Sequence, residues 1–364
     1  MCVNNSAPGS SPTGDFSESK RHALGLLNVL NLKNNRLTGI ISNISSDLGI
    51  LNLNGNQLQG DSLSNCRYLE VLDVRNNRLG GPFPYSHLDI LSNLRVLILR
   101  SNNFSGSFAN LCNASVPALQ IIDVASNSFS GCFSGLNTLM SGEGDQDASR
   151  QQRVIEYEVS GVSYQVAVVV RTEGLELELV KITAIFESLD LSTNKLEGEI
   201  PMQIGVLKLL RVLNMSHDYP KGQIPASIGN SRQLVLQSID LSGNQLSGRI
   251  PLELNSLKLL EVLNLSYNQL VGSIPTGPQF LTFSNDSFIE NPVLCGQPLW
   301  RKCENSSEEQ GVGGSYSGSS PENWLIISVQ VGFQSQRGWE LCLDRFFCVE
   351  NGGCGTSNSR ERTE

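Results

Sequence analysis

The sequence predicts an α/β-type repeat fold: a curved solenoid whose parallel β-sheet lines the concave side and whose array is interrupted by one island. The first observation is a template, L-x-x-L-x-L-x-x-N-x-L-x-G, which occurs nine times in the 364 residues. The second is its regular period, since Asn244 and Asn268 stand 24 residues apart. The third is a stretch from Cys132 to Ile185 that lacks the template. Self-similarity at such a period is the signature of stacked repeats.

Each fixed position of the template has a physical role, and the copy from Leu260 to Pro275 shows all of them. Leu-x-Leu alternates with the period of a strand, so its leucines point inward. Asn bonds backbone groups where the chain turns away, and Gly permits tight backbone geometry. The Ile-Pro that often follows favours an extended return. Because the period lies in the leucine-rich-repeat range and nine copies make buried helices the poorer interpretation, we expect a leucine-rich-repeat solenoid.

One repeat departs from the template. Asp218 stands where Asn is expected, and Pro220 stands where an apolar residue is expected. A buried carboxylate accepts hydrogen bonds but offers no amide donor. We therefore expect local distortion at this repeat.

The template divides the chain into six parts. They are a non-repetitive, disordered start (1–25), leucine-rich repeats (26–131), the island (132–185), further leucine-rich repeats (186–275), a C-terminal cap (276–304) and a flexible, aberrant tail (305–364). A cap is needed because the last repeat otherwise exposes apolar surface.

The island reads first as a polar, mobile loop from Ser141 to Arg153. Apolar and alternating runs follow, from Tyr157 to Val170 and from Leu175 to Val180. They predict short strands with a hairpin through Thr172-Glu173-Gly174, folded against the concave face or its edge. Long insertions in compact arrays are either functional or disordered, so the island is the functional candidate, with a merely tolerated insertion as the alternative.

Composition and motifs exclude several classes of function. The net charge of −9 argues against nucleic acid and anionic membranes as partners. The chain has no kinase motifs and no metal-ligand spacing of His or Cys. We therefore expect no enzyme, no cofactor and no metal. Met1 to Lys20 has no signal-peptide character, and the apolar run from Trp324 to Phe333 is about half of the ~20 residues that a membrane helix needs, so we expect no integration into a bilayer.

Polar residues between the strand leucines face the concave surface and are the candidate ligand-binding residues: Lys33, Asp73, Arg75, Arg100, Asp123, Asp190 and Asp240. Carboxylates in series are also found in glycosidases. Here they recur at one template position, which favours solvated strand faces. Ordinary surface charge is the preferred interpretation of the three cations, with a small basic patch suited to an acidic ligand as the alternative.

Cysteines and sequons give a mild indication of secretion. Nine cysteines leave at least one unpaired, and the one pairing we predict is Cys295 with Cys303, eight residues apart in the cap. Eight N-x-Ser/Thr sequons occur, slightly more than chance supplies. The glycosylation sites that we expect are Asn43, Asn103, Asn113, Asn214, Asn264 and Asn285.

The repeats resemble those of plant receptor-like proteins with leucine-rich-repeat ectodomains, which act in disease resistance and development. The resemblance rests on the Gly-x-Ile-Pro ending, on an island placed four repeats before the end, and on the closing Asn291-Pro-Val-Leu-Cys-Gly-Gln-Pro-Leu with Cys303 behind it. It implies that a peptide, protein or glycan ligand binds the concave face and island, and that a co-receptor kinase is recruited near the last four repeats. It also implies the extracellular side of the plasma membrane, reached only by a full-length form with the membrane helix.

We therefore expect a ligand- or elicitor-binding ectodomain fragment that signals through a partner kinase. One alternative is a secreted inhibitor of a cell-wall-degrading enzyme. The island argues against it, because the similar plant inhibitors are uninterrupted arrays. Another is a non-functional truncated gene product, since the start lacks a cysteine cap and the run from Glu322 to Phe333 begins like a membrane helix and then becomes unrelated sequence.

Overall fold

A computed structural model describes residues 28–41, 47–59, 67–85, 88, 91–112, 116, 118–133, 136, 186–230 and 235–303, together with six strands outside these ranges. These residues lie in one compact unit, Met1–Ser306. The predicted polar loop from Ser141 to Arg153 and the tail from 305 to 364 lie outside the described residues, as does the apolar run from Trp324 to Phe333.

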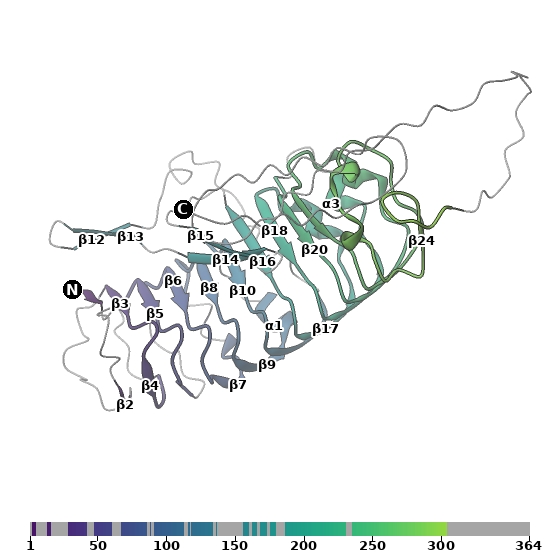
Figure 1. Ribbon diagram of the computed structural model, residues 1–364. Coiled ribbons are helices and arrows are strands. Elements are labelled where there is room, and N and C mark those ends of the chain that lie inside the picture. The colour runs from purple at the N-terminus through teal and green to yellow at the C-terminus, as the bar shows by residue number, and fades with distance from the viewer. Residues whose placement is uncertain are drawn as a thin grey trace, which may run out of the picture. The chain divides into compact units, whose positions relative to one another are not determined.

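The main sheet has ten parallel strands (Figure 1). Their order in the sheet is their order along the chain, and the strands between them in sequence belong to other sheets. The ten strands are β1 (Cys2–Asn4), β3 (Val29–Asn31), β5 (Ile50–Asn52), β6 (Val71–Asp73), β8 (Val96–Ile98), β10 (Ile121–Asp123), β16 (Glu187–Asp190), β18 (Leu210–Asn214), β20 (Ser238–Asp240) and β22 (Val262–Asn264). The predicted solenoid with a parallel sheet is thereby confirmed. The island does not interrupt the sheet, because β10 pairs directly with β16 and Asp123 stands opposite Asp190.

A second parallel sheet of eight strands runs along the other side of the repeats (Figure 1). Its strands are β7 (Gly80–Pro82), β9 (Asn103–Ser107), β11 (Ser128–Gly131), β17 (Lys195–Glu199), β19 (Tyr219–Gln223), β21 (Gln245–Gly248), β23 (Gln269–Ser273) and β24 (Val293–Cys295). Short helical turns complete the later repeats: η3 (Met202–Val206), α3 (Ser227–Asn230) and η4 (Leu252–Ser256). Each repeat therefore contributes one strand to the main sheet and most contribute a second strand that returns along the opposite side.

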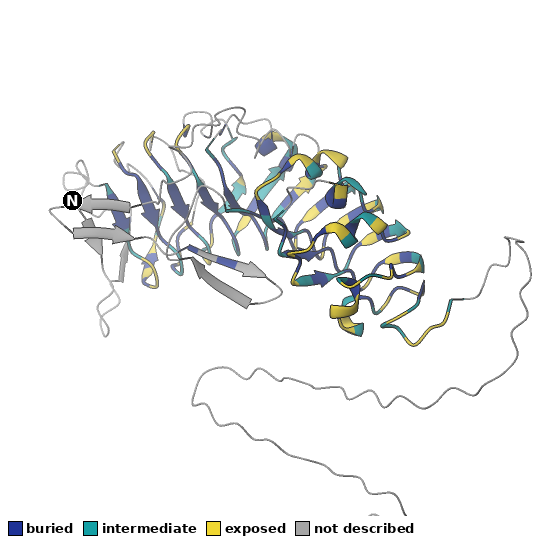
Figure 2. Ribbon diagram, turned by 90° about the horizontal axis from the view of Figure 1, so that it is seen from above, coloured by how far each residue is buried: buried dark blue, intermediate teal, exposed yellow. Residues whose placement is uncertain are grey.

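The template leucines form one continuous core between the two sheets. In Figure 2 the stacked strands are mostly dark blue, and in the first repeats Leu30, Leu51 and Leu72 are 2% exposed or less. Aromatic rings replace leucine near the island, where Phe83, Phe104 and Phe129 pack edge-to-face or stacked. Burial of this repeated apolar face holds the stack together, because no single repeat can bury it alone.

The template asparagines form a second continuous structure, an asparagine ladder. Asn77 is typical: Oδ1 accepts the N–H of Leu58 at 3.1 Å, and Nδ2 donates to the carbonyls of Leu53 at 2.9 Å and Val74 at 3.0 Å. Each rung thus bonds its own repeat and the one before it. The same pattern recurs at Asn56, Asn102, Asn127, Asn194 and Asn268, as the sequence predicted for this position.

The ladder changes at Asp218, where the sequence predicted distortion. Pro220 has no N–H to offer the next rung, so Oδ1 of Asn244 accepts the N–H of Asp218 instead, at 3.0 Å. Oδ1 of Asp218 accepts the N–H groups of Asn194 at 2.9 Å and Leu196 at 3.2 Å. Its Oδ2 is buried without a hydrogen-bond partner among the described residues, and burial raises the pKa of Asp218 to about 7.

Two described strands within the first 25 residues differ from the predicted disordered start. β1 pairs in parallel with β3, with Cys2 opposite Val29, and β2 (Thr13–Asp15) pairs with β4 (Arg36–Thr38). The segment Cys-Val-Asn carries the strand pattern of Val-Leu-Asn one repeat later. The edge of a parallel sheet favours such pairing, because its backbone groups otherwise lack partners.

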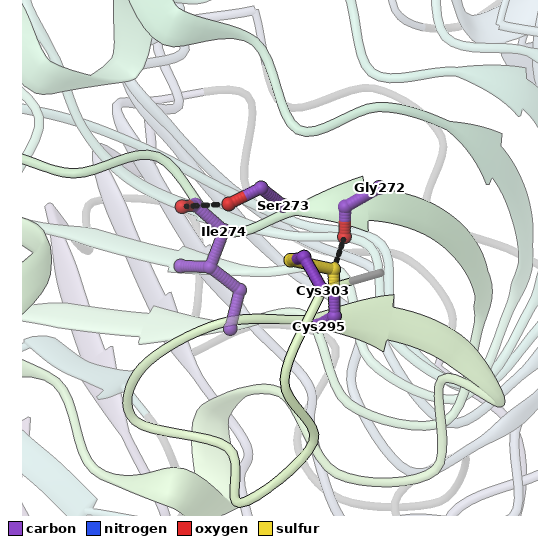
Figure 3. The surroundings of a disulfide bond; sticks show 5 residues. All are labelled: Gly272, Ser273, Ile274, Cys295 and Cys303. Atoms are coloured by element: carbon purple, nitrogen blue, oxygen red, sulfur yellow. Dashed lines mark hydrogen bonds between the residues drawn. A yellow bond between two sulfur atoms is a disulfide. The ribbon is translucent and has the colours of Figure 1, made fainter. Parts of the chain in front are cut away.

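The cap contains a further rung of the ladder, which the sequence analysis missed. Oδ1 of Asn291 accepts the N–H of Leu270 at 3.0 Å, and its Nδ2 donates to the carbonyl of Leu265 at 3.0 Å. Behind it, β24 extends the second sheet by pairing with β23. Cys295 and Cys303 form a disulfide with their Cα atoms 5.0 Å apart, and Sγ of Cys295 lies 3.2 Å from the carbonyl of Gly272 (Figure 3). The cap is therefore a partial repeat closed by a covalent loop.

Replacing Asp218 with Asn is expected to stabilise the solenoid at neutral pH, because the amide supplies the donor that a carboxylate lacks. The pKa of Asp218 is raised from 3.8 to about 7 by burial, so the folded chain holds this proton more tightly than the unfolded chain. The associated stability is complete below about pH 4 and is lost as the pH rises through about 7. Asp218→Asn should raise the free energy of unfolding by about 1–3 kcal/mol at about pH 8, as measured by denaturant unfolding.

Asn268→Asp is the matched control, because it creates the same defect at a regular rung. It should lower the free energy of unfolding more at about pH 8 than at about pH 5. An unchanged pH profile in Asp218→Asn would contradict the role assigned to Oδ2.

Candidate ligand-binding face

The outward side chains of the main sheet, here called the sheet face, form three columns because strand residues alternate between core and surface. The second and third columns carry the polar residues that the sequence analysis singled out. The first column stands one residue before each strand leucine and is mostly apolar. It comprises Val29, Ile50, Val71, Val96, Ile121, Ser188, Val212, Ser238 and Val262. The sequence analysis missed this column, although a β-branched residue before the leucine marks it in most repeats.

The island covers part of this apolar column. Its strands are β12 (Glu156–Val159), β13 (Val162–Gln165), β14 (Val168–Thr172) and β15 (Leu175–Leu179). β14 and β15 are antiparallel, with Thr172 opposite Leu175, which confirms the predicted hairpin. Val168 and Val170 are 2% and 4% exposed and belong to one apolar cluster with Val96, Ile98 and Ile121 of the sheet face. The predicted packing of the island on this face is therefore confirmed for β14.

Arg100 joins the repeats on either side of the island. Its Nε donates to Oδ2 of Asp123 at 2.7 Å, and its Nη2 contacts Oδ2 of Asp190. All three residues are buried. Burial and the neighbouring Asp190 raise the pKa of Asp123, whereas the attraction of Arg100 lowers it. One guanidinium is thus shared between two carboxylates, and the whole island lies between these two carboxylates in the sequence.

Arg75 and Asp73 form a second ion pair on the sheet face, with Nη2 and Oδ2 3.3 Å apart. Burial raises the pKa of Asp73 to about 6, although the charges of Arg75 and Lys33 both lower it. The two arginines of the predicted basic patch therefore face carboxylates. These ion pairs argue against the alternative of a free basic patch suited to an acidic ligand, because Arg75 and Arg100 each contact carboxylates that recur at the same template position.

Beyond the island the second and third columns form a regular set of bonds, here called the Asx–Ser ladder. Its pairs are Asp190 with Ser192, Asn214 with Ser216, Asp240 with Ser242, and Asn264 with Ser266. In each pair Oδ1 of the Asx residue accepts the serine N–H at 3.0–3.2 Å and the serine hydroxyl at 2.7–2.8 Å. This repeated local bonding supports the strand-face interpretation of the carboxylates over paired glycosidase acids.

Most residues of the Asx–Ser ladder line the floor of a polar groove of about 560 Å³, here called the groove. Its lining residues come from the sheet face, from the turns that follow the strands, and from the cap. They are Arg100, Ser126, Ser192, Thr193, Asn214, Ser216, His217, Asp240, Ser242, Asn264, Ser284, Asp286 and Ser287. Of the predicted ligand-binding residues, the groove includes Arg100 and Asp240, and Asp123 and Asp190 hold Arg100 in place. Lys33, Asp73 and Arg75 do not line it.

Sequence reasoning missed the contributions of His217, Ser284 and Asp286 to the groove. His217 precedes the ladder position Asp218 and has a φ of 56°, the conformation that residues before a rung adopt in most repeats. This turn directs the residue toward the groove rather than the core. Asp286 lies in η6 (Asn285–Ser287) of the cap, which carries no copy of the template and so gave no sequence signal.

The predicted glycosylation sites fall in different environments. Asn103 is exposed at the start of β9 on the second sheet, whereas Asn214 and Asn264 lie in the groove. Asn285 is half-buried in η6, and Asn43 and Asn113 lie outside the described residues.

Replacing Arg100 with Met is expected to destabilise the junction at the island, because two buried carboxylates then lose their shared counter-ion. Removing one partner of a buried ion pair costs about 3–5 kcal/mol. The free energy of unfolding should fall by that amount at about pH 8 and by less at about pH 5, because burial raises the pKa of Asp123 and this carboxyl then takes up a proton.

Arg78→Met is the matched control, because Arg78 is exposed, and it should change stability by less than about 0.5 kcal/mol. An equal loss in Arg100→Met at both pH values would show that the carboxylates are not the cause.

Comparison with known proteins agrees with this geometry. The leucine-rich-repeat family model matches residues 235–257 and 259–281. Receptor-like protein 47 of Arabidopsis thaliana is 50% identical over 160 residues, which are 43% of this chain and 20% of that protein. Receptor-like protein 50 of the same plant is 53% identical over 148 residues, 40% of this chain and 16% of that protein. The chain thus spans a fifth or less of the length of these relatives.

Solved structures with the same architecture include two plant receptor kinase complexes. The LRR ectodomain of GASSHO1/SCHENGEN3 from Arabidopsis thaliana, in complex with CASPARIAN STRIP INTEGRITY FACTOR 2, is 29% identical with a TM-score of 0.54, covering 77% of this chain and 31% of that one. The Arabidopsis receptor kinase HAESA, in complex with the peptide hormone IDA and the co-receptor SERK1, is 27% identical with a TM-score of 0.54, covering 80% and 46%.

A third neighbour is the complex PEPR1-AtPEP1, which is 27% identical with a TM-score of 0.57 and covers 81% of this chain and 39% of that one.

The helices of the part of the chain that the structure describes include none with the length and apolar character of a membrane span. The repeats and the structural neighbours together identify the chain as a leucine-rich-repeat solenoid, and its sequence is similar to plant receptor-like proteins over 40–43% of its length.

Proposed function

We propose that the chain is the ligand- or elicitor-binding part of a plant cell-surface receptor-like protein, which acts on the extracellular side of the plasma membrane through a partner kinase. The observation that carries the proposal is the position of the groove. It extends from Arg100 and Ser126, in the repeats whose apolar column contacts β14, across the sheet face of the repeats that follow the island to the cap. A binding surface of this kind needs no catalytic group.

The division of the sheet face supports a binding role. Before the island the first column is apolar without interruption, and the hairpin occupies part of it. After the island serines at 188 and 238 interrupt the column, and the polar groove opens beside it. Polar groups of fixed orientation give a concave site its specificity. The Asx–Ser ladder fixes those groups through its own hydrogen bonds.

The known complexes indicate the kind of ligand and partner. HAESA binds the peptide hormone IDA together with the co-receptor SERK1, and PEPR1 is solved with AtPEP1. We propose a peptide as the ligand of the groove and a co-receptor kinase as the partner of the four repeats after the island. The partner would supply the catalytic output, because the sequence carries no kinase motif.

The test changes the island in a full-length relative that bears the same island. Val168→Asp with Val170→Asp places two charges in the apolar cluster and should release the hairpin from the sheet face. The ligand response and the co-receptor recruitment, measured by co-precipitation after ligand treatment, should both fall at least ~10-fold, since one buried charge costs more than the ~1.4 kcal/mol that this factor represents.

Val168→Ile with Val170→Ile is the matched control, which keeps the packing apolar and should leave both readouts unchanged. Replacing residues 141–180 with a short linker is the second test. Normal response and recruitment after that swap would make the island a bystander and would favour an uninterrupted inhibitor-like array.

The groove also bears on glycosylation. We propose glycans at Asn103, Asn285, Asn43 and Asn113, and we propose that Asn214 and Asn264 stay unmodified in the ligand-binding form, because a glycan on either would fill the groove. Peptide mapping of the secreted full-length protein should find Asn103 occupied and the two groove sites free. Full occupancy at Asn214 or Asn264 would be incompatible with a ligand in the groove.

A further inference from the structure

We infer that the groove receives a cationic side chain of an extended peptide, an arginine or lysine, at Asp240. This inference rests on the proposed function and specifies the chemistry of its ligand. It depends on three features of the groove: its charge, the unused atoms of its floor, and the absence of apolar side chains among its lining residues.

The charge of the groove is acidic once internal pairs are counted. Arg100 is the one Lys or Arg among the described lining residues, and its Nε and Nη2 are bound to Asp123 and Asp190. Asp240 and Asp286 then remain, with the imidazole of His217 as the other ionisable group. An anionic group entering the groove would meet two carboxylates and no free guanidinium or ammonium. A cation would find the complementary potential.

Asp240 is built to accept such a cation. The residue is 8% exposed, and its Oδ1 is held by the N–H of Ser242 at 3.0 Å and by the hydroxyl of Ser242 at 2.7 Å. Its Oδ2 has no hydrogen-bond partner among the described residues, although the residue lines the groove. Burial raises the pKa of Asp240, as does the charge of Asp190, whereas the hydrogen bonds from Ser242 and the charge of His217 lower it. A guanidinium at Oδ2 would add a charge-assisted hydrogen bond to this carboxylate.

The neighbouring rungs supply donors on both sides of this carboxylate. Asn214 and Asn264 stand directly opposite Asp240 in the adjacent strands β18 and β22. Their Oδ1 atoms are bound to Ser216 and Ser266, so each Nδ2 is left without a partner in the part of the chain that the structure describes. Adjacent strands lie about 4.8 Å apart. The floor therefore presents the amide of Asn214, the carboxylate of Asp240 and the amide of Asn264 in series. The two amide N–H groups can donate to backbone carbonyl oxygens of a peptide whose basic side chain reaches Asp240.

The remaining lining residues favour a polar ligand over an apolar one. Hydroxyl and amide groups predominate, and none of the described lining residues has an aliphatic or aromatic hydrocarbon side chain. Binding would then derive from hydrogen bonds and charge rather than from an apolar anchor. Specificity follows, because a peptide with Glu or Gln at this position leaves Oδ2 repelled or poorly bonded.

The experiment titrates the whole chain with three capped pentapeptides, acetyl-Gly-Ser-X-Ser-Gly-amide with X as Arg, Gln or Glu, by isothermal titration calorimetry or NMR. The Arg peptide should bind at least ~10-fold more tightly than the Gln peptide, and the Glu peptide most weakly. Asp240→Asn keeps the Oδ1 acceptor for Ser242 but removes the charge, and it should weaken Arg binding at least ~10-fold while leaving Gln binding unchanged.

Glu261→Gln is the matched control, because it removes one exposed carboxylate that directly precedes β22, the strand beside Asp240, and lies outside the groove. It should leave all three affinities unchanged, and thermal melts should show both variants folded. Equal or tighter binding of the Glu peptide, an unchanged Kd in Asp240→Asn, or no binding of any peptide at ~10 mM would overturn the inference. If the ligand response of the receptor still required the island in those cases, the proposed function would stand and only the inferred ligand chemistry would be wrong.

Discussion

Every repeat of this solenoid has to turn its chain twice within about 24 residues, and each turn leaves backbone groups that would otherwise be buried without partners. The asparagine ladder meets this constraint. Each rung accepts one N–H of the preceding repeat and donates to carbonyls of both repeats, so the rungs fix the offset between repeats as well as satisfying the backbone. The in-register sheet and the positions of its outward columns follow from that offset. At Asp218 the chain keeps the offset by moving one hydrogen bond, and the cost is one buried oxygen without a donor.

The same constraint explains how an array of similar repeats acquires two unlike regions on one face. Register decides which residues point outward, but it does not decide their chemistry. Where the first column is β-branched, a hairpin can pack on it. Where serines interrupt that column and the Asx–Ser pairs repeat, the face stays open and polar. The regions meet at Arg100, whose two carboxylate partners come from the last repeat before the island and the first repeat after it.

The fold was predictable from the sequence because its determinants are local and repeated. Leu-x-Leu and Asn recur at a fixed spacing, and the island hairpin follows from alternating apolar residues around Glu173-Gly174. The ion triad was not predictable, because Asp123 and Asp190 are far apart in sequence and become neighbours only when β10 pairs with β16. The groove was predictable in part. Asp240 stood in a recognised column, whereas Asp286 comes from the cap, and the bonds that leave Oδ2 of Asp240 unused depend on side-chain geometry that spacing alone does not encode.

The direct pairing of β10 with β16 has a consequence for how this architecture changes over time. The two strands pair directly although the island lies between them in the chain. The repeats therefore constrain the sequence of the island mainly at the pair of small apolar side chains that contact the sheet. Loops whose ends lie close together accept changes of length at little thermodynamic cost. The island can therefore change in length and sequence without disturbing the pairing of the repeats on either side of it. Under the proposed function, changes in the island would alter the ligand-binding surface while the repeats that carry it stay the same.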